Sequence, residues 1–298
     1  MADKKRLVLI DGSSYLYRAF YALPPLTSPK GQPTGAIYGF IRMLSKLVNQ
    51  LNLSHIAVIF DLPGKTFRHK KYKEYKATRK ETPDELKTQI KPLKEIIKLW
   101  GIKIIEIPGY EADDIIATLT KKGKENGYEV IIVTPDKDMM QLVEEGIFVL
   151  NPVTDELYDR EKVKEKYGIY PEQFVDYLAM IGDTVDNIIG VRGVGPKTAA
   201  RLLNEFGSLN NIIKSLNNLK PKLKEAFTQI GDQLEQNRFL VKLKTDVEID
   251  IKLEDLKKGK TDLIELKRKF EELGFKSLLK EINKAGKVEE KGKQKSLF

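Results

Sequence analysis

Three apolar, β-branched runs in this chain each end on an aspartate. The run RLVLID ends at Asp11, HIAVIFD ends at Asp61, and EVIIVTPDKD ends at Asp136 and Asp138. Such runs are typical of buried strands in a parallel sheet, and parallel sheets bind ligands beyond the carboxyl ends of their strands. We therefore expect the four aspartates to gather on one rim, where a divalent cation would offset their mutual repulsion.

The residue types present restrict how a metal could be bound. The chain has no cysteine and only two histidines, His55 and His69. Disulfides, iron–sulfur clusters and thiolate zinc sites are excluded, and His55 opens a predicted strand, which removes a histidine-rich zinc site. Oxygen ligands remain, and these favour Mg²⁺ or Mn²⁺.

Charge and hydropathy indicate the compartment and the class of partner. The chain has 298 residues and a net charge of +9. A chain that concentrates acids at one site yet is basic overall is expected to have a polyanionic partner; the alternative is that lysines only aid solubility. Neither a signal peptide nor an apolar run of membrane length is recognisable, so we expect a cytoplasmic, nucleoid-associated protein without membrane contact.

The alternation of patterns predicts two domains. Strand and helix patterns alternate to about residue 150, interrupted by a Pro/Gly-rich loop at 23–35, and Pro92 predicts a kink or break in the helix that begins near Pro83. From about residue 160 the spacing is helical. We expect an α/β domain over 1–170 with a mostly parallel central sheet and flanking helices. A smaller all-α domain is expected over 171–285, with a flexible tail at 286–298.

Five further carboxylates lie in two short segments. GYEADD contributes Glu111, Asp113 and Asp114 at a helix start, and IGDTVDN contributes Asp183 and Asp186. Acids in a first turn also complement a helix dipole, which would explain one or two of them. The spacing of three in the second segment places both aspartates on one face if it is helical.

The total of nine carboxylates predicts more than one ion. One Mg²⁺ takes one or two carboxylates and keeps several waters. Two ions about 4 Å apart clamp the attacking and leaving oxygens of a phosphoryl displacement. The sequence therefore predicts a two-metal site that acts on a phosphodiester.

Residues 65–80 form a basic segment with interleaved aromatics. KTFRHKKYKEYKATRK holds eight Lys/Arg, one Glu and three aromatics, directly after the Asp61 strand. Basic groups follow phosphates and aromatic faces stack on bases; the alternative is a solvated amphipathic helix. Lys76 and Arg79 could touch adjacent phosphates from one helix face.

A glycine turn precedes a predicted helix in GVRGVGPKTAARLL. Backbone N–H groups at such a turn bind phosphate without base preference. The pattern is that of a helix-hairpin-helix, and the alternative is an ordinary helix–turn–helix connection. The candidate DNA contacts in this segment are Gly193, Val194, Gly195, Lys197 and Thr198.

Taken together, these segments resemble a known family. LIDGSSYLYRAF, AVIFD, TFRHKKYKEYKATR, PGYEADDIIATL, TPDKDMMQL, GDTVDNIIGVRGVGPKTAARLL and GSLNNI occur in the order of the 5′ nuclease (flap endonuclease) family, over roughly residues 6–270. The closest resemblance is to the 5′→3′ exonuclease domain of bacterial DNA polymerase I. It implies a PIN/resolvase-like α/β fold with a helix-hairpin-helix domain. All nine carboxylates are then metal ligands or outer-sphere partners.

The resemblance also implies roles for the basic segment and the glycine turn. Residues 63–95 would form a helical arch over the metals, with Tyr75, Lys76 and Arg79 as arch residues and Arg68 as an addition. Lys76 and Arg79 would orient the scissile phosphate as catalytic residues. The glycine turn would hold duplex DNA, with K⁺ as a candidate ion there.

The implied activity is a Mg²⁺-dependent hydrolase of DNA, in which Mn²⁺ can substitute. Its expected substrates are 5′ flaps, nicks and RNA–DNA primer junctions in replication and repair, and a monomer is expected. Two rivals remain: a junction-binding protein without catalysis, and a ribonuclease with a related metal site. The cluster of acids near a polyanion argues against the first, and the duplex-binding turn argues against the second.

The end of the chain suggests a further partner. Polymerase I homologues continue into further domains, whereas this chain ends at Phe298, so a free-standing nuclease is expected. Gln294, Leu297 and Phe298 resemble the short peptide by which bacterial proteins dock on the sliding clamp, and an apolar pair on a Lys-rich tail suits groove binding. The alternative is a terminus without a binding role.

Overall fold

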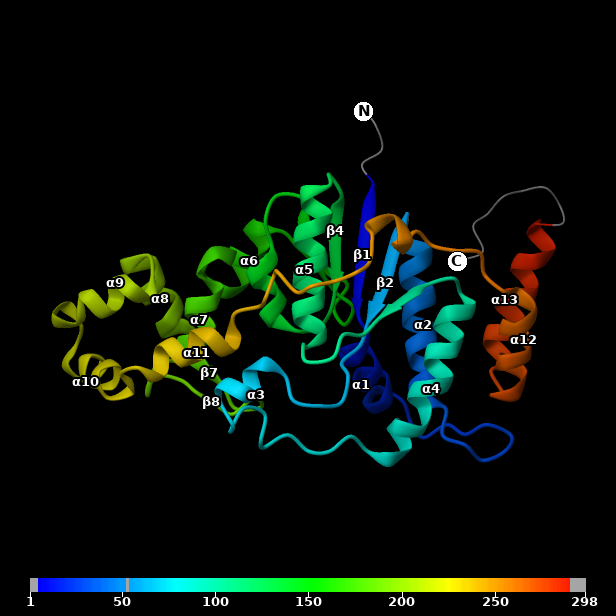
Figure 1. The fold of residues 1–298 in the computed structure, drawn as a ribbon, viewed down its shortest axis with the longest axis horizontal. Helices are drawn as coiled ribbons and strands as arrows, with labels where there is room; N and C mark the ends of the chain where they lie inside the picture. Colours follow the sequence, from blue (N-terminus) through cyan, green and yellow to red (C-terminus); the bar gives the residue numbers. More distant parts are fainter. Residues whose placement is uncertain (1–4, 52–53, 290–298) are drawn as a thin grey trace.

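The computed structural model describes residues 5–51 and 54–289 and places a six-stranded sheet at the centre of the first domain (Figure 1). The strand order is β3-β2-β1-β4-β5-β6, in which the first five strands are parallel and β6 is an antiparallel edge. The strands are β1 (Arg6–Asp11), β2 (His55–Ile59), β3 (Lys103–Ile105), β4 (Glu129–Val133), β5 (Ile147–Asn151) and β6 (Glu156–Tyr158).

Both faces of this sheet are covered, which explains the continuous apolar runs. Leu7 and Leu9 of β1 pack into the core beneath α5 (Ala112–Glu125), whereas Val8 and Ile10 pack on the opposite side. All four side chains are fully buried. The helices of the opposite face are α1 (Gly12–Ala22), α2 (Gly35–Gln50) and α4 (Asp84–Leu99). The predicted parallel sheet is confirmed, and the short strand β6 was not predicted.

The helical unit extends to one side of the sheet domain (Figure 1). A hairpin of β7 (Gly182–Asp183) and β8 (Ile188–Ile189) connects its second helix to its third. The helices are α6 (Arg160–Tyr167), α7 (Phe174–Ile181), α8 (Pro196–Phe206), α9 (Leu209–Lys214), α10 (Pro221–Ile230) and α11 (Gln233–Val241).

After α11 the chain returns to the sheet domain. A strap over residues 242–262 passes across α5 (Figure 1) and leads to α12 (Leu263–Glu272) and α13 (Lys276–Glu289). Leu266 and Phe270 are fully buried in the same core as α2 and α4. The predicted boundary at residue 285 grouped these helices with the second domain, whereas their apolar faces pack on the first.

The segment between β2 and α4 differs from the expected helical arch. Only α3 (Phe67–Lys71) is helical between β2 and α4, and residues 73–78 form turns. Lys76 has a φ of 58°, a left-handed conformation that interrupts any helix. The predicted break at Pro92 is wrong, because α4 runs through it without interruption.

Within residues 5–51 and 54–289, no helix is both long enough and apolar enough to cross a membrane.

Candidate metal centre and nucleic-acid interface

Asp11 ends β1, and Asp61 lies two residues beyond the end of the neighbouring strand β2. Asp11 caps α1, with Oδ1 accepting from the Ser14 N–H at 2.9 Å and Oδ2 accepting from the Thr134 hydroxyl at 2.8 Å. Burial, with a smaller contribution from the charge of Asp61, raises the pKa of Asp11 to about 6. Asp61 accepts from the Ala112 N–H at 2.8 Å and so joins the end of β2 to the start of α5.

Asp113 faces carboxylates from three strands. Burial raises its pKa well above the ordinary value, and the charges of Asp11, Asp136 and Asp61 raise it further. Carboxylates repel in this way only when they are close and poorly hydrated. The charges of the strand-end acids therefore act on Asp113, as the prediction of a common rim requires.

Asp136 and Asp138 lie at a 3-10 helix, Lys137–Leu142, that follows β4. Asp136 Oδ1 accepts from the Asp138 N–H at 2.9 Å. Burial, followed by the charge of Asp136, raises the pKa of Asp138 to about 7. Among the described side chains, Asp138 Oδ1 is one of the few buried oxygens that has no hydrogen-bond partner.

Asp183 and Asp186 lie in the β7–β8 hairpin and not on a helix, which corrects the helical spacing considered for them. Asp183 Oδ1 accepts from the N–H groups of Val185 and Asp186 at 2.8 and 3.2 Å. Asp183 Oδ2 pairs with Lys137 Nζ at 3.1 Å. Lys137 was not predicted as a site residue, although its position between Asp136 and Asp138 was a usable signal.

We call these eight residues the acid rim: Asp11, Asp61, Glu111, Asp113, Asp136, Asp138, Asp183 and Asp186.

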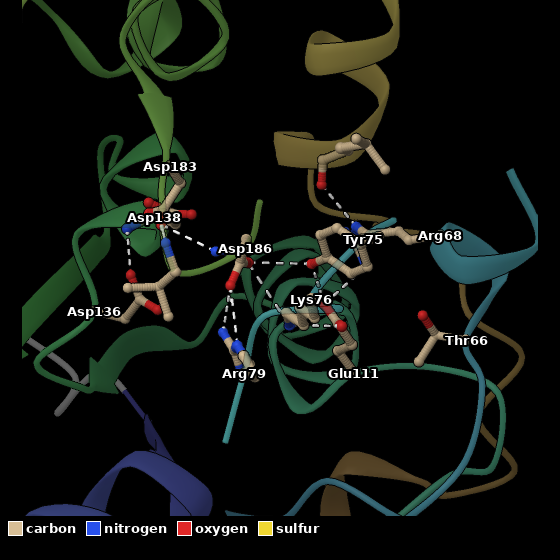
Figure 2. A network of polar contacts seen from close by, with 12 residues as sticks. Thr66, Arg68, Tyr75, Lys76, Arg79, Glu111, Asp136, Asp138, Asp183 and Asp186 are labelled. Carbon is tan, nitrogen blue, oxygen red and sulfur yellow. Dashed lines mark hydrogen bonds and ion pairs between the residues drawn. The ribbon is translucent and has the colours of Figure 1, made fainter. Parts of the chain in front are cut away.

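Side chains from the basic segment reach the acid rim (Figure 2). Lys76 Nζ lies 2.6 Å from Glu111 Oε1, and Arg79 donates to Asp186 Oδ1 at 2.6 Å. The Tyr75 hydroxyl donates to Glu111 at 3.1 Å and to Asp186 at 3.3 Å. Tyr75 is only 3% exposed, so its ring is not offered to a base in this arrangement.

Arg68 and Asp114 form a buried pair, and neither lies where it was expected. Arg68 is 1% exposed and Asp114 is fully buried, and their guanidinium and carboxylate make two hydrogen bonds of 2.6 and 2.8 Å. A guanidinium in this position cannot reach DNA, and a carboxylate in this position cannot reach a metal on the rim. We therefore remove Arg68 from the DNA contacts and Asp114 from the metal ligands.

The glycine turn is exposed at its backbone. Gly193 has a φ of 76°, Gly195 caps α8, and a Cβ placed on either would meet no atom within 4 Å. The Val194 side chain is buried, so this residue offers only backbone groups. Lys197 is exposed and Thr198 is partly so, in the first turn of α8. The turn thus has the geometry expected for a backbone phosphate contact.

The acid rim contains many oxygen ligands, but its side chains are not arranged around a common ion position. Among the residues that the structure describes, no group of three or more Asp, Glu, His or Cys side chains is arranged to hold a metal ion. Lys76, Arg79 and Lys137 pair with rim carboxylates instead. The rim nevertheless fits divalent metal chemically, because its donors are all oxygens and the buried Asp138 Oδ1 makes no hydrogen bond, although Lys137 Nζ lies 3.5 Å from it.

Comparison with known sequences decides the family. Residues 6–168 match the 5′-3′ exonuclease, N-terminal resolvase-like domain, and residues 169–263 match the 5′-3′ exonuclease, C-terminal SAM fold. The chain belongs to the 5′-3′ exonuclease family. The two matches meet at residue 168, close to the predicted domain boundary at 170.

Two relatives show that the matched region occurs both as a whole protein and as part of a longer one. A 5′-3′ exonuclease of Aquifex aeolicus is 48% identical over 294 residues, which are 99% of this chain and 100% of the relative. A DNA polymerase I of Bacillus caldotenax is 41% identical over 99% of this chain, but the match spans only 34% of that protein. The predicted resemblance to the family is confirmed.

Two solved structures share the fold. A T5 5′-exonuclease with bound divalent metal ions (zinc) is 25% identical, with a TM-score of 0.67 over 80% of this chain and 89% of that one. Human GEN1 in complex with Holliday junction DNA is 16% identical, with a TM-score of 0.62 over 98% of this chain and 75% of that one. The predicted fold class is confirmed. Gln294, Leu297 and Phe298 lie outside the described residues.

Proposed function

We propose that this chain is a structure-specific 5′ nuclease that hydrolyses phosphodiesters at 5′ flaps, nicks and RNA–DNA primer junctions in replication and repair. The observation that carries the proposal is the acid rim, where carboxylates from the strand ends, α5 and the hairpin meet the cations of the basic segment, as in the pairs of Glu111 with Lys76 and of Asp186 with Arg79. A cluster of like-charged, partly buried carboxylates is unfavourable for folding. It is useful where cations and a phosphodiester must meet.

The rim residues divide into two groups that would hold two Mg²⁺ ions or their waters. The first group comes from the sheet and α5: Asp11, Asp61, Glu111 and Asp113. The second group comes from the 3-10 helix and the hairpin: Asp136, Asp138, Asp183 and Asp186. Two such ions supply an activated water and stabilise charge on the leaving oxygen, and Mn²⁺ can replace Mg²⁺.

Lys76 and Arg79 would act on the scissile phosphate. In the present structure they neutralise Glu111 and Asp186. When metal supplies that neutralisation, both cations become available to a phosphate on the same rim, and their donors can orient it and stabilise its charge. The expected products carry a 5′-phosphate and a 3′-hydroxyl.

The rest of the basic segment and the glycine turn would bind DNA without reading sequence. Lys70, Lys71 and Lys73 are exposed in the same basic segment as Lys76 and suit a single-stranded 5′ end. The backbone at 193–195, with Lys197 and Thr198, suits the duplex phosphates, and K⁺ is a candidate ion at this turn. We assign nuclease chemistry to the first domain and duplex binding to the second.

A cleavage assay tests the proposal. A 5′-labelled flap DNA is incubated with the full chain and Mg²⁺, with EDTA as the control. We expect cleavage in the presence of Mg²⁺ and none in EDTA. DNA binding without cleavage in either condition would favour the junction-binding alternative. Comparable cutting of single-stranded RNA would favour the ribonuclease alternative.

The chain terminus provides a separate proposal, in which residues 294–298 dock on the sliding clamp of a bacterial replisome. Deletion of these five residues should abolish binding to the clamp, measured by surface plasmon resonance, and should leave flap cleavage unchanged. Equal affinity of the full and shortened chains would remove the proposal.

A further inference from the structure

The buried guanidinium of Arg68 joins three parts of the molecule. It makes the two-bond pair with Asp114 of α5, and one terminal nitrogen also donates to Glu111 at 3.2 Å. The remaining donors go to backbone carbonyls, with Nε to Leu240 at 2.7 Å and the second terminal nitrogen to Lys242 at 3.0 Å. All three nitrogens are therefore used, and none faces solvent or DNA.

The two carbonyls belong to the end of α11, in the helical unit. The last carbonyls of a helix have no partner within the helix, and the negative end of the helix dipole attracts a cation there. Arg68 meets both requirements at once. The contact thus ties α3, at the base of the basic segment, to the point where the chain leaves the helical unit.

The same helix also contacts the hairpin of the acid rim. Asn237 of α11 is fully buried, and its amide donates to the carbonyls of Ala179 at 3.0 Å and Ile189 at 2.7 Å. Ile189 lies in β8, the strand that pairs with Asp183 in β7. One helix therefore touches the hairpin on one side and Arg68 on the other.

On the opposite side, Arg68 holds the first turn of α5. Asp114 and Glu111 flank Asp113 in this turn, and Asp114 Oδ1 also accepts from the Lys244 N–H at 2.9 Å. Without the guanidinium, the fully buried Asp114 carboxylate would lose its cation, which is a strongly unfavourable arrangement, and Glu111 would keep only Lys76. The turn that presents Glu111 and Asp113 depends on Arg68 for its position.

We propose that Arg68 is a positioning residue, which ties α11 to the first turn of α5 and fixes the turn from which Glu111 and Asp113 would reach a divalent cation. This inference rests on the proposed function, since it assumes that the acid rim binds divalent metal. Partners in the outer shell of a metal site typically change metal affinity by roughly 10–100-fold.

The experiment measures Mn²⁺ binding to the full chain without DNA, by electron paramagnetic resonance of the free ion, together with thermal unfolding. The main variant is Arg68→Met. The double variant Arg68→Met/Asp114→Asn removes both buried charges, so its stability should recover at least in part. Arg68→Lys keeps the charge but lacks the fork that binds a carboxylate through two bonds.

Arg238→Met is the matched control. Arg238 also lies on α11 and pairs with a carboxylate, Asp176, at 2.8 Å, with Asn210 and Glu235 as its other partners. None of these belongs to the acid rim. Its loss should lower stability and leave the Mn²⁺ dissociation constant within about twofold of wild type.

The expected result is a Mn²⁺ dissociation constant raised roughly tenfold or more in Arg68→Met and in the double variant, with an intermediate value in Arg68→Lys. If Arg68→Met does not fold, the double variant and Arg68→Lys give the same comparison. Wild-type Mn²⁺ affinity in the double variant would reduce Arg68 to a structural ion pair and overturn the inference. An equal loss in Arg238→Met would overturn it too. Wild-type protein that binds no Mn²⁺ would instead remove the proposed function.

Discussion

The acid rim and the glycine turn offer different atoms to the same ligand. The rim presents side-chain charges that are already paired, such as Glu111 with Lys76 and Asp186 with Arg79. The turn at 193–195 presents backbone groups with open space around them. Hydrolysis of a phosphodiester requires charged side chains that can change partners. Binding a phosphate requires only a rigid turn whose backbone N–H groups the phosphate can approach. We expect substitutions at the rim to change rates and substitutions at the turn to change affinities.

Asp136→Ala tests this contrast most strongly. Loss of a rim carboxylate should lower the cleavage rate of flap DNA by about 1,000-fold or more, because metal-derived stabilisation of the transition state is worth several kcal/mol. DNA affinity, measured by fluorescence anisotropy in EDTA, should stay within about twofold of wild type. A variant that cuts at the wild-type rate would show that the metal assignment is wrong.

Lys76→Ala should have the next largest effect. Removal of one donor to a developing charge typically lowers a rate by about 100-fold, and loss of one phosphate contact should reduce the salt slope of binding by about 1. Single-turnover cleavage across a salt series measures both. Lys73→Ala, an exposed lysine of the same segment, is the control and should change the salt slope with little effect on the low-salt rate. Identical kinetics for wild type and Lys76→Ala would exclude the phosphate contact.

Asp138→Asn should stabilise the metal-free protein at high pH. The folded pKa of Asp138 is raised to about 7 from an ordinary 3.8, so the folded state binds the proton more tightly than the unfolded state. Stability should therefore fall as pH rises from 4 towards 7, and the full penalty applies above 7. Asparagine removes this penalty, which is worth at most about 4 kcal/mol for a shift of this size. Thermal unfolding in EDTA should show a higher Tm for the variant at pH 8 and no such advantage at pH 4. A lower Tm for Asp138→Asn than for wild type at pH 8 would contradict the unfavourable burial of the Asp138 charge beside Asp136.

Substitution of the two glycines of the turn should give the smallest effect, and the pair separates an effect on duplex binding from an effect on stability. Gly195 has a φ of −91° and open space, so Gly195→Ala should leave stability within about 0.5 kcal/mol of wild type. A methyl group there should still weaken duplex binding several-fold, because phosphate must approach the backbone. Gly193→Ala should lose about 1–2 kcal/mol of stability as well, because its φ is 76°. Wild-type duplex affinity in Gly195→Ala would remove the turn from the interface.

Local patterns predicted the sheet and most of the acid rim. A β-branched run such as RLVLI requires burial on both faces, and the parallel sheet follows from that requirement. The placement of carboxylates at strand ends follows from the topology in turn, and the charges of Asp11, Asp136 and Asp61 contribute to raising the pKa of Asp113.

Contacts between distant residues could not be predicted in this way. Arg68 is 172 residues from Leu240, whose carbonyl it binds. The sequence of a basic segment does not show which of its side chains is buried and which is exposed. The return of α12 and α13 to the first domain has the same origin, since an apolar helix face does not specify its partner. Lys76 was expected on a helix, but its φ of 58° depends on the loop around it.

The course of the backbone through the helical unit has a consequence for where the enzyme would cut. The chain both leaves the sheet domain and comes back to it, and Arg68 fastens the returning end beside α5. A module attached at two places can tilt very little. The distance from the glycine turn to the acid rim is then fixed. We therefore expect incision at a constant number of nucleotides from the junction, whatever the length of the flap.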